Sequence, residues 1–225
     1  MNEIIIKEKY ILEYIRNMLY ACSYAIKNID DNAYQYHHNT AYEYAPSIIK
    51  YGILSIEELN SLGIRSYSKD YLKFIDDIES HVNGKDGISL SVTGLTDLYK
   101  DEDEFDPCQS NIVDFLVDEN IKTVRNTTHY GNEFICSEPI NNNLIRAIDF
   151  RILMLINNLL DNKLTGNTEQ VKMILEKYNA LKKVCEQMKK SNLDAYLREM
   201  SIEKSTLDYE KMASNPYLKL KKQGK

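Results

Sequence analysis

Long apolar runs are missing from this sequence of 225 residues. Charged residues interrupt the partly hydrophobic first thirty positions, and no later run reaches the ~20 apolar residues that a membrane-spanning helix needs. We therefore expect no signal peptide, no transmembrane span and no membrane partner. The expected location is the cytoplasm.

Cysteine is scarce as well, and its four positions form no motif. Cys22, Cys108, Cys136 and Cys185 lie far apart, without the CxxC spacing of a zinc or redox site and without the density of a disulfide framework. We expect free thiols in a reducing compartment and no metal centre. The acidic run at residues 99–111, "YKDEDEFDPCQSN", is interpreted as a solvated loop.

A surplus of basic residues is also absent. The chain has 28 Lys and Arg against 34 Asp and Glu, which gives a formal net charge of −6. This balance argues against the broad electropositive surface that non-specific nucleic-acid binding needs. Proteins or small molecules are therefore the expected partners, and the 43% of apolar residues predicts a chain that folds.

Helical periodicity marks both ends of the chain. Near the N-terminus, apolar residues at steps of three and four predict one amphipathic helix over about residues 3–29: Ile11, Ile15, Met18, Cys22, Ala25 and Ile29. Near the C-terminus, two more helices are predicted from Leu144, Ile148, Ile152, Leu155 and Leu159, and from Ile174, Tyr178, Leu181, Cys185 and Met188. The predicted organisation is an N-terminal helix over 1–30, a core over 31–142, and a helical extension with a basic tail over 143–225.

The centre of the chain is rich in predicted strands. They are "AYQYHHN", "ISLSVT", "NIVDFLVD", "IKTV" and "NEFICSEPI". Between the first two, Pro46 suits the first turn of a short helix and Gly52 suits its left-handed C-terminal cap. A further helix is predicted over residues 68–81. The mixture of helices and strands predicts an α+β fold.

Two side chains in these strands are candidates for chemistry. His38 follows an aromatic strand and precedes Asn39 and Thr40, so polar groups converge where a strand meets a turn. In a regular strand, His37 points to the opposite face. Glu133 is a carboxylate inside a strand-like segment, and because burying an unpaired carboxylate is costly, it has a partner, lies at an edge or faces a functional cleft.

The order of these elements resembles the ADP-ribosyltransferase superfamily, in its diphtheria-toxin and poly-ADP-ribose-polymerase branch. There, a strand ending in His-Gly-Thr or His-Gly-Ser is followed by a helix of the form "SI…GI", and "HNT" with "APSIIKYGI" is the counterpart here. A Gly-Ile-Tyr-Phe-Ala motif with a later tyrosine is similar to "GISLSVTGLTDLY". A third strand carries the catalytic glutamate, and "NEFI" fits that place. Asn39 stands where the family has glycine.

The resemblance implies a split β-sheet core flanked by the N-terminal amphipathic helix and the C-terminal helical region. It also implies an NAD site. His38, with Thr40 beside it, would hold ribose hydroxyls of NAD, Tyr99 would stack on the nicotinamide, and Ser91 and Thr96 would support the pocket.

Glu133 is the catalytic residue that the resemblance implies. Its carboxylate would bind a ribose hydroxyl and stabilise the positive charge that develops as nicotinamide departs, which is the electrostatic problem that glycosidases solve with a carboxylate. Tyr67 and Tyr71 are alternatives to Tyr99 for the stacking role. His129 and Tyr130, in a loop before Glu133, are candidates for contact with the acceptor.

The function implied is mono-ADP-ribosylation of an intracellular macromolecule by an effector, toxin or phage–host conflict protein. NAD would be consumed as a substrate, and a protein acceptor is favoured over a nucleic acid. One alternative is a non-catalytic protein of the same fold whose amphipathic helices bind a partner. Another is an RNA 2′-phosphotransferase-like enzyme, for which Arg65 and Arg125 are the only central arginines. The sequence leaves the oligomeric state open.

Overall fold

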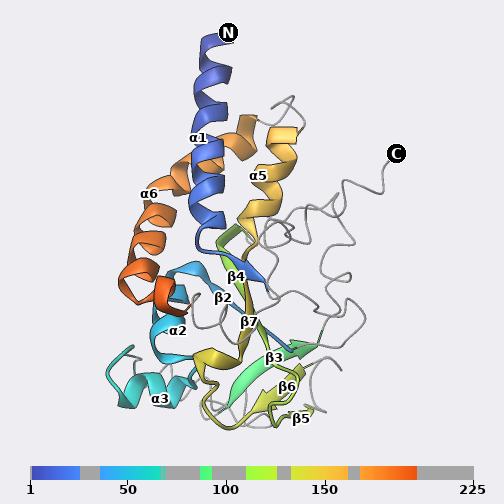
Figure 1. Ribbon diagram of the computed structural model, residues 1–225, viewed down its shortest axis with the longest axis vertical. Helices are drawn as coiled ribbons and strands as arrows, with labels where there is room; N and C mark the ends of the chain where they lie inside the picture. Colours follow the sequence, from blue (N-terminus) through green and yellow to red (C-terminus); the bar gives the residue numbers. More distant parts are fainter. Residues whose placement is uncertain are drawn as a thin grey trace.

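A seven-stranded antiparallel sheet and a set of helices make up the described part of the chain (Figure 1). The computed structural model describes residues 2–25, 36–66, 68, 87–92, 110–125, 133–161 and 168–196. The strands are β1 (Tyr24–Ala25), β2 (Tyr36–Ala41), β3 (Ile88–Val92), β4 (Ile112–Val117), β5 (Val124–Arg125), β6 (Glu133–Cys136) and β7 (Ile145–Phe150). The α-helices are α1 (Asn2–Tyr20), α2 (Ala45–Tyr51), α3 (Ile56–Ser61), α5 (Ile152–Asp161) and α6 (Thr168–Lys190), and short 3-10 turns span Tyr42–Tyr44 and Asn142–Leu144. The α+β class is confirmed.

The sheet is held together unevenly. Its strand order is β1-β7-β4-β2-β3-β6-β5. Strand β2 pairs with β4 along all six of its residues, but among the described residues it pairs with β3 only through Tyr36–Val92 and His37–Ser91. Beyond His37 the two strands part, while β3 continues alongside β6. The sheet therefore divides into two halves that are joined at one end of β2 and β3.

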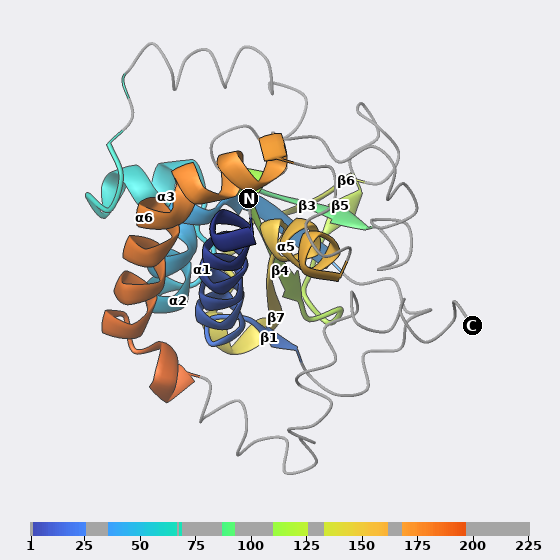
Figure 2. The same cartoon turned by 90° about the horizontal axis from the view of Figure 1, so that it is seen from above.

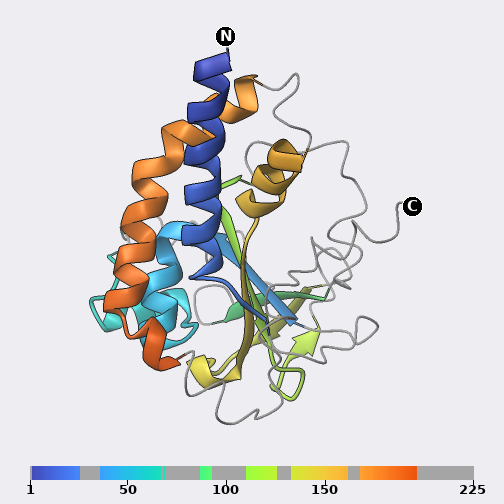
Figure 3. The same cartoon turned by 45° about the horizontal axis from the view of Figure 1, so that its top comes forward.

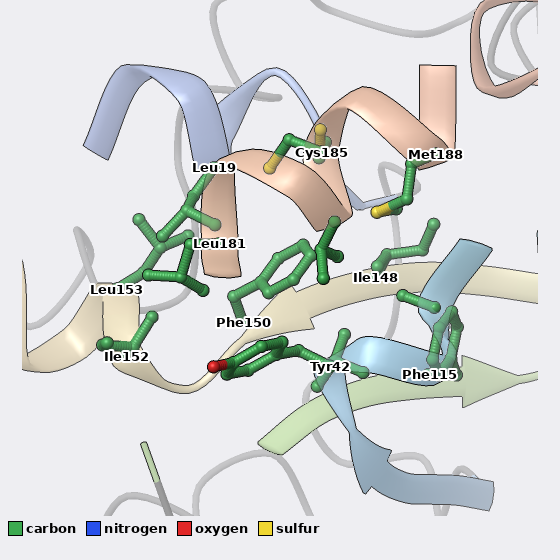
Figure 4. Close-up of a cluster of buried hydrophobic side chains, with 14 of the residues drawn as sticks. Leu19, Tyr42, Phe115, Ile148, Phe150, Ile152, Leu153, Leu181, Cys185 and Met188 are labelled. Carbon is green, nitrogen blue, oxygen red and sulfur yellow. The ribbon is translucent and has the colours of Figure 1, made fainter. Parts of the chain in front are cut away.

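The hydrophobic core lies between one face of the sheet and helices α1, α5 and α6. Alternate residues of β4 point to one face of a strand, and Val113, Phe115 and Val117 belong to the cluster of buried residues that includes these helices. Figure 4 shows Leu19, Leu181, Cys185 and Met188 gathered over Ile148 and Phe150. Helix α1 contacts both α6 and α5, and Figure 2 shows most of α1 between them, while Figure 3 shows the start of α6 crossing α1.

The apolar stripes of α1 and α6 are used inside the molecule. Leu12, Ile15 and Leu19 of α1 are fully buried, as are Ile174 and Leu181 of α6. Because these residues recur at steps of three, four and seven, one face of each helix meets the other helix or the sheet. In the described part of the chain, no helix is long and apolar enough to cross a membrane.

The N-terminal helix is shorter than the predicted range of 3–29. It ends at Tyr20, and Tyr24–Ala25 then form a strand that pairs with Ile148 and Ala147 of β7. The edge of β7 offers backbone hydrogen-bonding groups that outweigh the helical spacing of Cys22 and Ala25. Residues 26–35 lie outside the described residues, so the end of the predicted range is not placed.

The predicted single helix over residues 144–159 is wrong, because its first half is strand β7. The pairing of β7 with β4 contains a bulge: Phe115 is opposite Ile148, whereas Val117 is opposite Ile145. The extra residue puts Ile145 and Ile148, three positions apart, on the same buried side. Two buried residues three positions apart are also the pattern of an amphipathic helix, so the sequence suggested a helix here. Helix α5 begins only at Ile152, and the sheet therefore extends beyond residue 142.

Helix α2 begins and ends where predicted, with Pro46 in its first turn and Gly52 as its C-terminal cap. The cap does not have the expected left-handed helical conformation, because Gly52 has a φ of +83° and a ψ of −174°. A Cβ atom on Gly52 would lie 2.3 Å from the carbonyl oxygen of Ile140. The next residue, Ile53, exchanges two backbone hydrogen bonds of 2.9 Å with Ile140. This close approach needs glycine and fastens the end of α2 beside the chain that leaves β6.

The described cysteines are free thiols, as expected. Cys22, Cys136 and Cys185 are all buried, and Cys108 lies outside the described residues. Cys22 and Cys185 share a hydrogen bond between the end of α1 and α6, and this bond together with burial raises the pKa of the Cys185 thiol. The helix predicted over residues 68–81 also lies outside the described residues, apart from Ser68.

Candidate functional site

His38 and Glu133 lie on the two strands that flank β3, and both bind Ser89. The Nδ1 atom of His38 is 3.1 Å from the carbonyl oxygen of Ser89. The hydroxyl of the same serine donates a hydrogen bond to the Oε1 atom of Glu133. Ser89 itself is exposed, whereas His38 and Glu133 are half-buried. One solvent-accessible serine thus connects the two candidate side chains, which are 95 positions apart.

The protonation state of His38 follows from its surroundings. Burial lowers the pKa of the imidazole, against smaller opposing effects of the Ser89 hydrogen bond and the charge of Asp114. The ring is therefore neutral at physiological pH. Because a carbonyl oxygen can only accept, Nδ1 carries the hydrogen in this contact. The lone pair is then on Nε2, which can accept a hydrogen bond from a ligand hydroxyl.

The parting of β2 from β3 decides how these groups meet. By strict alternation, His38 shares the helix side of the sheet with Phe115, while Glu133 is opposite Ser91 and Ser91 is opposite His37. The register alone would separate His38 from Glu133. However, the carbonyl group of Ser89 lies in the plane of the strands, and no backbone group of β2 beyond His37 forms a hydrogen bond with this carbonyl. The imidazole of His38 binds the carbonyl oxygen in place of a backbone group.

A second histidine belongs to a buried hydrogen-bonded pair. The Nδ1 atom of His37 lies 2.8 Å from the Oδ2 atom of Asp114 on β4, and the two side chains are 0% and 5% exposed. His37 is opposite Ser91, so it lies on the same face of the sheet as Ser91 and Glu133. The expectation that His37 and His38 point to opposite faces agrees with this register.

Sequence reasoning did not single out Ser89 or Asp114. The signal for Asp114 was present, because a lone carboxylate in the apolar run "IVDFLV" needs a partner once that strand is buried. Its partner is 77 positions away, which no local pattern indicates. For Ser89, the signal was the hydroxyl-bearing face of "ISLSV", of which only Ser91 was chosen.

The other predicted site residues divide into two groups. Ser91 lies in the site: it is opposite Glu133, and its hydroxyl is 3.5 Å from the carbonyl oxygen of His37. Thr40 is near the end of β2, opposite Val113, two residues beyond His38. The remaining candidates lie outside the described residues: Tyr67, Tyr71, Thr96, Tyr99, His129 and Tyr130.

The two central arginines lie on different elements. The guanidinium of Arg65, after α3, stacks over the ring of Tyr44 at 4.0 Å from its centroid. Arg125 is on β5, opposite Phe134. Within the described ranges, no group of three or more His, Cys, Asp or Glu side chains is arranged to hold a metal ion.

Comparison with known proteins adds no relative. No protein-family model, no curated protein and no solved structure matches the chain.

Proposed function

We propose that the chain is an NAD-consuming mono-ADP-ribosyltransferase. The observation that carries the proposal is the shared contact of His38 and Glu133 with Ser89. The motifs that resemble the superfamily lie on β2, β3 and β6, and these three strands are consecutive neighbours in the sheet. The parting of β2 from β3 beyond His37 also fits the split sheet that the resemblance implies.

The roles of His38 and Glu133 in the reaction follow from the lone pair of the imidazole and the negative charge of the carboxylate. The Nε2 lone pair of His38 accepts a hydrogen bond from a ribose hydroxyl of NAD. Glu133 lies close to the same sugar, and its negative charge stabilises the oxocarbenium-like ribose as the bond to nicotinamide breaks. The bonding electrons leave with nicotinamide, which was a cationic pyridinium and becomes neutral. Ser89 fixes the orientation of the carboxylate.

A single transfer to a protein is the favoured outcome. The formal charge of −6 disfavours a nucleic-acid acceptor. The chain would act as an effector, a toxin or a phage–host conflict protein that modifies an intracellular macromolecule. Thr40, Ser91, Thr96 and Tyr99 keep the supporting roles in NAD binding that the resemblance implies.

The test compares wild type with Glu133→Gln in an assay with NAD labelled in its adenylate part and a cell lysate. Glutamine has nearly the same shape and lacks the charge, so nicotinamide release should fall by about 10²- to 10³-fold. Glu138→Gln is the matched control, because Glu138 is exposed just beyond the same strand. Wild type that neither consumes NAD nor transfers label contradicts the proposal, as does full activity of Glu133→Gln.

A further inference from the structure

The buried pair of His37 and Asp114 has no role in the function proposed so far. A carboxylate oxygen can only accept, so Nδ1 of His37 carries the hydrogen in this 2.8 Å contact. The only nitrogen of the ring that can take up a proton from a ligand is then Nε2. Asp114 both orients the ring and would stabilise the imidazolium that forms if Nε2 took up a proton, which is the role of aspartate in catalytic triads.

The Nε2 atom of His37 is buried and has no hydrogen-bond partner among the residues that the structure describes. Buried polar atoms without a partner are rare, because the hydrogen bonds lost to water are not replaced. Such an atom calls for a donor that comes from outside the described residues. A hydroxyl group of a bound substrate is a donor of the right kind.

The register places this atom on the face of Glu133. His37 is opposite Ser91, and Ser91 is opposite Glu133, so the base and the carboxylate are two strand spacings apart, about 9–10 Å between Cα atoms. One sugar ring fits between side chains at that separation. Exposure along this face rises from buried His37 through half-buried Ser91 to exposed Ser89. A ligand over β3 would meet Ser91 and Glu133 directly, and it would reach the buried Nε2 atom of His37 only by displacing the groups that cover it.

We propose that His37, oriented by Asp114, is the general base of the transfer and that the acceptor is a protein hydroxyl group. This inference rests on the proposed ADP-ribosyltransferase function. In the step, the C1′–nitrogen bond breaks and its electrons leave with nicotinamide. The hydroxyl oxygen forms the new bond to C1′, and its proton passes to Nε2 of His37. Glu133 stabilises the ribose from the other side, as the two carboxyl groups of glycosidases share a sugar.

The chemical class of the acceptor follows from the role of a general base, which removes a proton from the attacking group. A carboxylate acceptor has no proton to lose at neutral pH, so a base would not accelerate its attack. A serine, threonine or tyrosine hydroxyl must lose its proton as it attacks, so a positioned imidazole lone pair accelerates this class of acceptor. Water has the same requirement, and NAD hydrolysis is the competing outcome.

The test uses His37→Gln and Asp114→Asn with sodium azide as an added nucleophile. Azide has no proton to lose, so it does not need the base. Transfer to protein hydroxyls should fall by roughly 10²- to 10⁴-fold in both variants. Azide should restore nicotinamide release in these two variants, yielding ADP-ribosyl azide, but not in Glu133→Gln. Circular dichroism and melting curves establish that the variants are folded.

Three results would overturn the inference while leaving the proposed function intact. The first is that both variants transfer label as well as wild type does. The second is that azide does not restore nicotinamide release in the folded variants. The third is that the label on acceptors modified by wild type is removed by neutral hydroxylamine, as from an ester, or is found on arginine by mass spectrometry. Free ADP-ribose as the sole product overturns the protein acceptor and leaves water as the nucleophile. Wild type that does not consume NAD at all shows instead that the proposed function fails.

A measurement on wild type covers the case in which the variants do not fold. Azide and the protein acceptor compete for the same ribose, and only the hydroxyl must transfer a proton as it attacks. In D₂O the product ratio should therefore shift toward ADP-ribosyl azide. An unchanged ratio contradicts a role for a general base.

Discussion

The Nδ1 atom of His38 lies 3.1 Å from the carbonyl oxygen of Ser89 on the neighbouring strand. The hydroxyl of that serine donates to Glu133 on the next strand, so the contact fixes the position of an imidazole and a carboxylate relative to each other. The contact exists because β2 stops pairing with β3 after His37, which leaves the carbonyl of Ser89 to a side chain. A local gap in the backbone pairing thus creates the candidate site.

Replacing Ser89 by alanine tests the link between the two side chains. The change removes the hydroxyl that orients Glu133 but leaves the backbone carbonyl that binds His38. We expect kcat for nicotinamide release to fall roughly 3- to 10-fold, the usual effect of one partly exposed hydrogen bond, with little change in NAD affinity. Ser89→Thr keeps the hydroxyl and should stay close to wild type. Equal rates for alanine, threonine and serine would show that the link does not matter for catalysis.

The lowered pKa of His38 predicts a pH dependence of stability. Because burial lowers this pKa below its ordinary value of 6.5 in the folded protein, the unfolded chain takes up the proton first as the pH falls. The free energy of unfolding should therefore be constant above about pH 7 as far as His38 is concerned. It should decrease below about pH 6.5, until the folded protein is protonated as well.

Urea unfolding of wild type and His38→Gln between about pH 5 and pH 8 measures this effect. His37 and Asp114 are present in both proteins, so their contribution cancels in the difference between the two curves. The stability of wild type relative to the variant should decline as the pH falls. A difference that is the same at every pH would contradict the assigned neutral state of His38.

Gly52→Ala should destabilise the fold more than an ordinary glycine substitution. The residue has a φ of +83°, and a Cβ would lie 2.3 Å from the carbonyl oxygen of Ile140. Gly63, with a φ of +64° and open space around a Cβ, is the matched control. Gly63→Ala should lower the free energy of unfolding by about 1–2 kcal/mol, the cost of the left-handed conformation alone. Denaturant unfolding should show a clearly larger loss for Gly52→Ala, and equal losses would mean that the close approach to Ile140 is not maintained.

Helix α1 should contribute to the same core as the sheet. Ile15 is fully buried, whereas Tyr10 on the same helix is 66% exposed. We expect Ile15→Ala to lower the free energy of unfolding by about 2–5 kcal/mol. Tyr10→Ala should change it by less than about 0.5 kcal/mol. Similar small effects of both substitutions would indicate that α1 is not part of the core and would favour a helix that serves a partner instead.

Helices and strands could be predicted from the sequence where one face of the element is buried along its whole length. Leu12, Ile15 and Leu19 repeat at three and four because a single stripe of α1 packs inward, so the helix was predictable. The error over 144–159 arose from the bulge in β7, which puts Ile145 and Ile148 on one side. A bulge depends on the partner strand, and a single sequence does not contain that information.

The candidate site shows the same limit. His38 and Glu133 stood out because a polar residue at a strand end and a carboxylate among apolar neighbours are locally unusual. The importance of Ser89 and the pairing of His37 with Asp114 follow from strand order and register, which depend on contacts between residues 77 and 51 positions apart. The alternation within "YHHN" predicted opposite faces for the histidines, but the sequence alone did not show which of them is paired with a buried carboxylate.

The most direct test of the central claim is a crystal structure of Glu133→Gln with NAD bound, since this variant should bind the substrate without cleaving it. The account predicts that the nicotinamide-side ribose lies over β3, with one hydroxyl within hydrogen-bonding distance of Nε2 of His38 and the side chain at position 133 in contact with the same sugar. NAD bound away from β2, β3 and β6, or no binding at millimolar concentration, would contradict it.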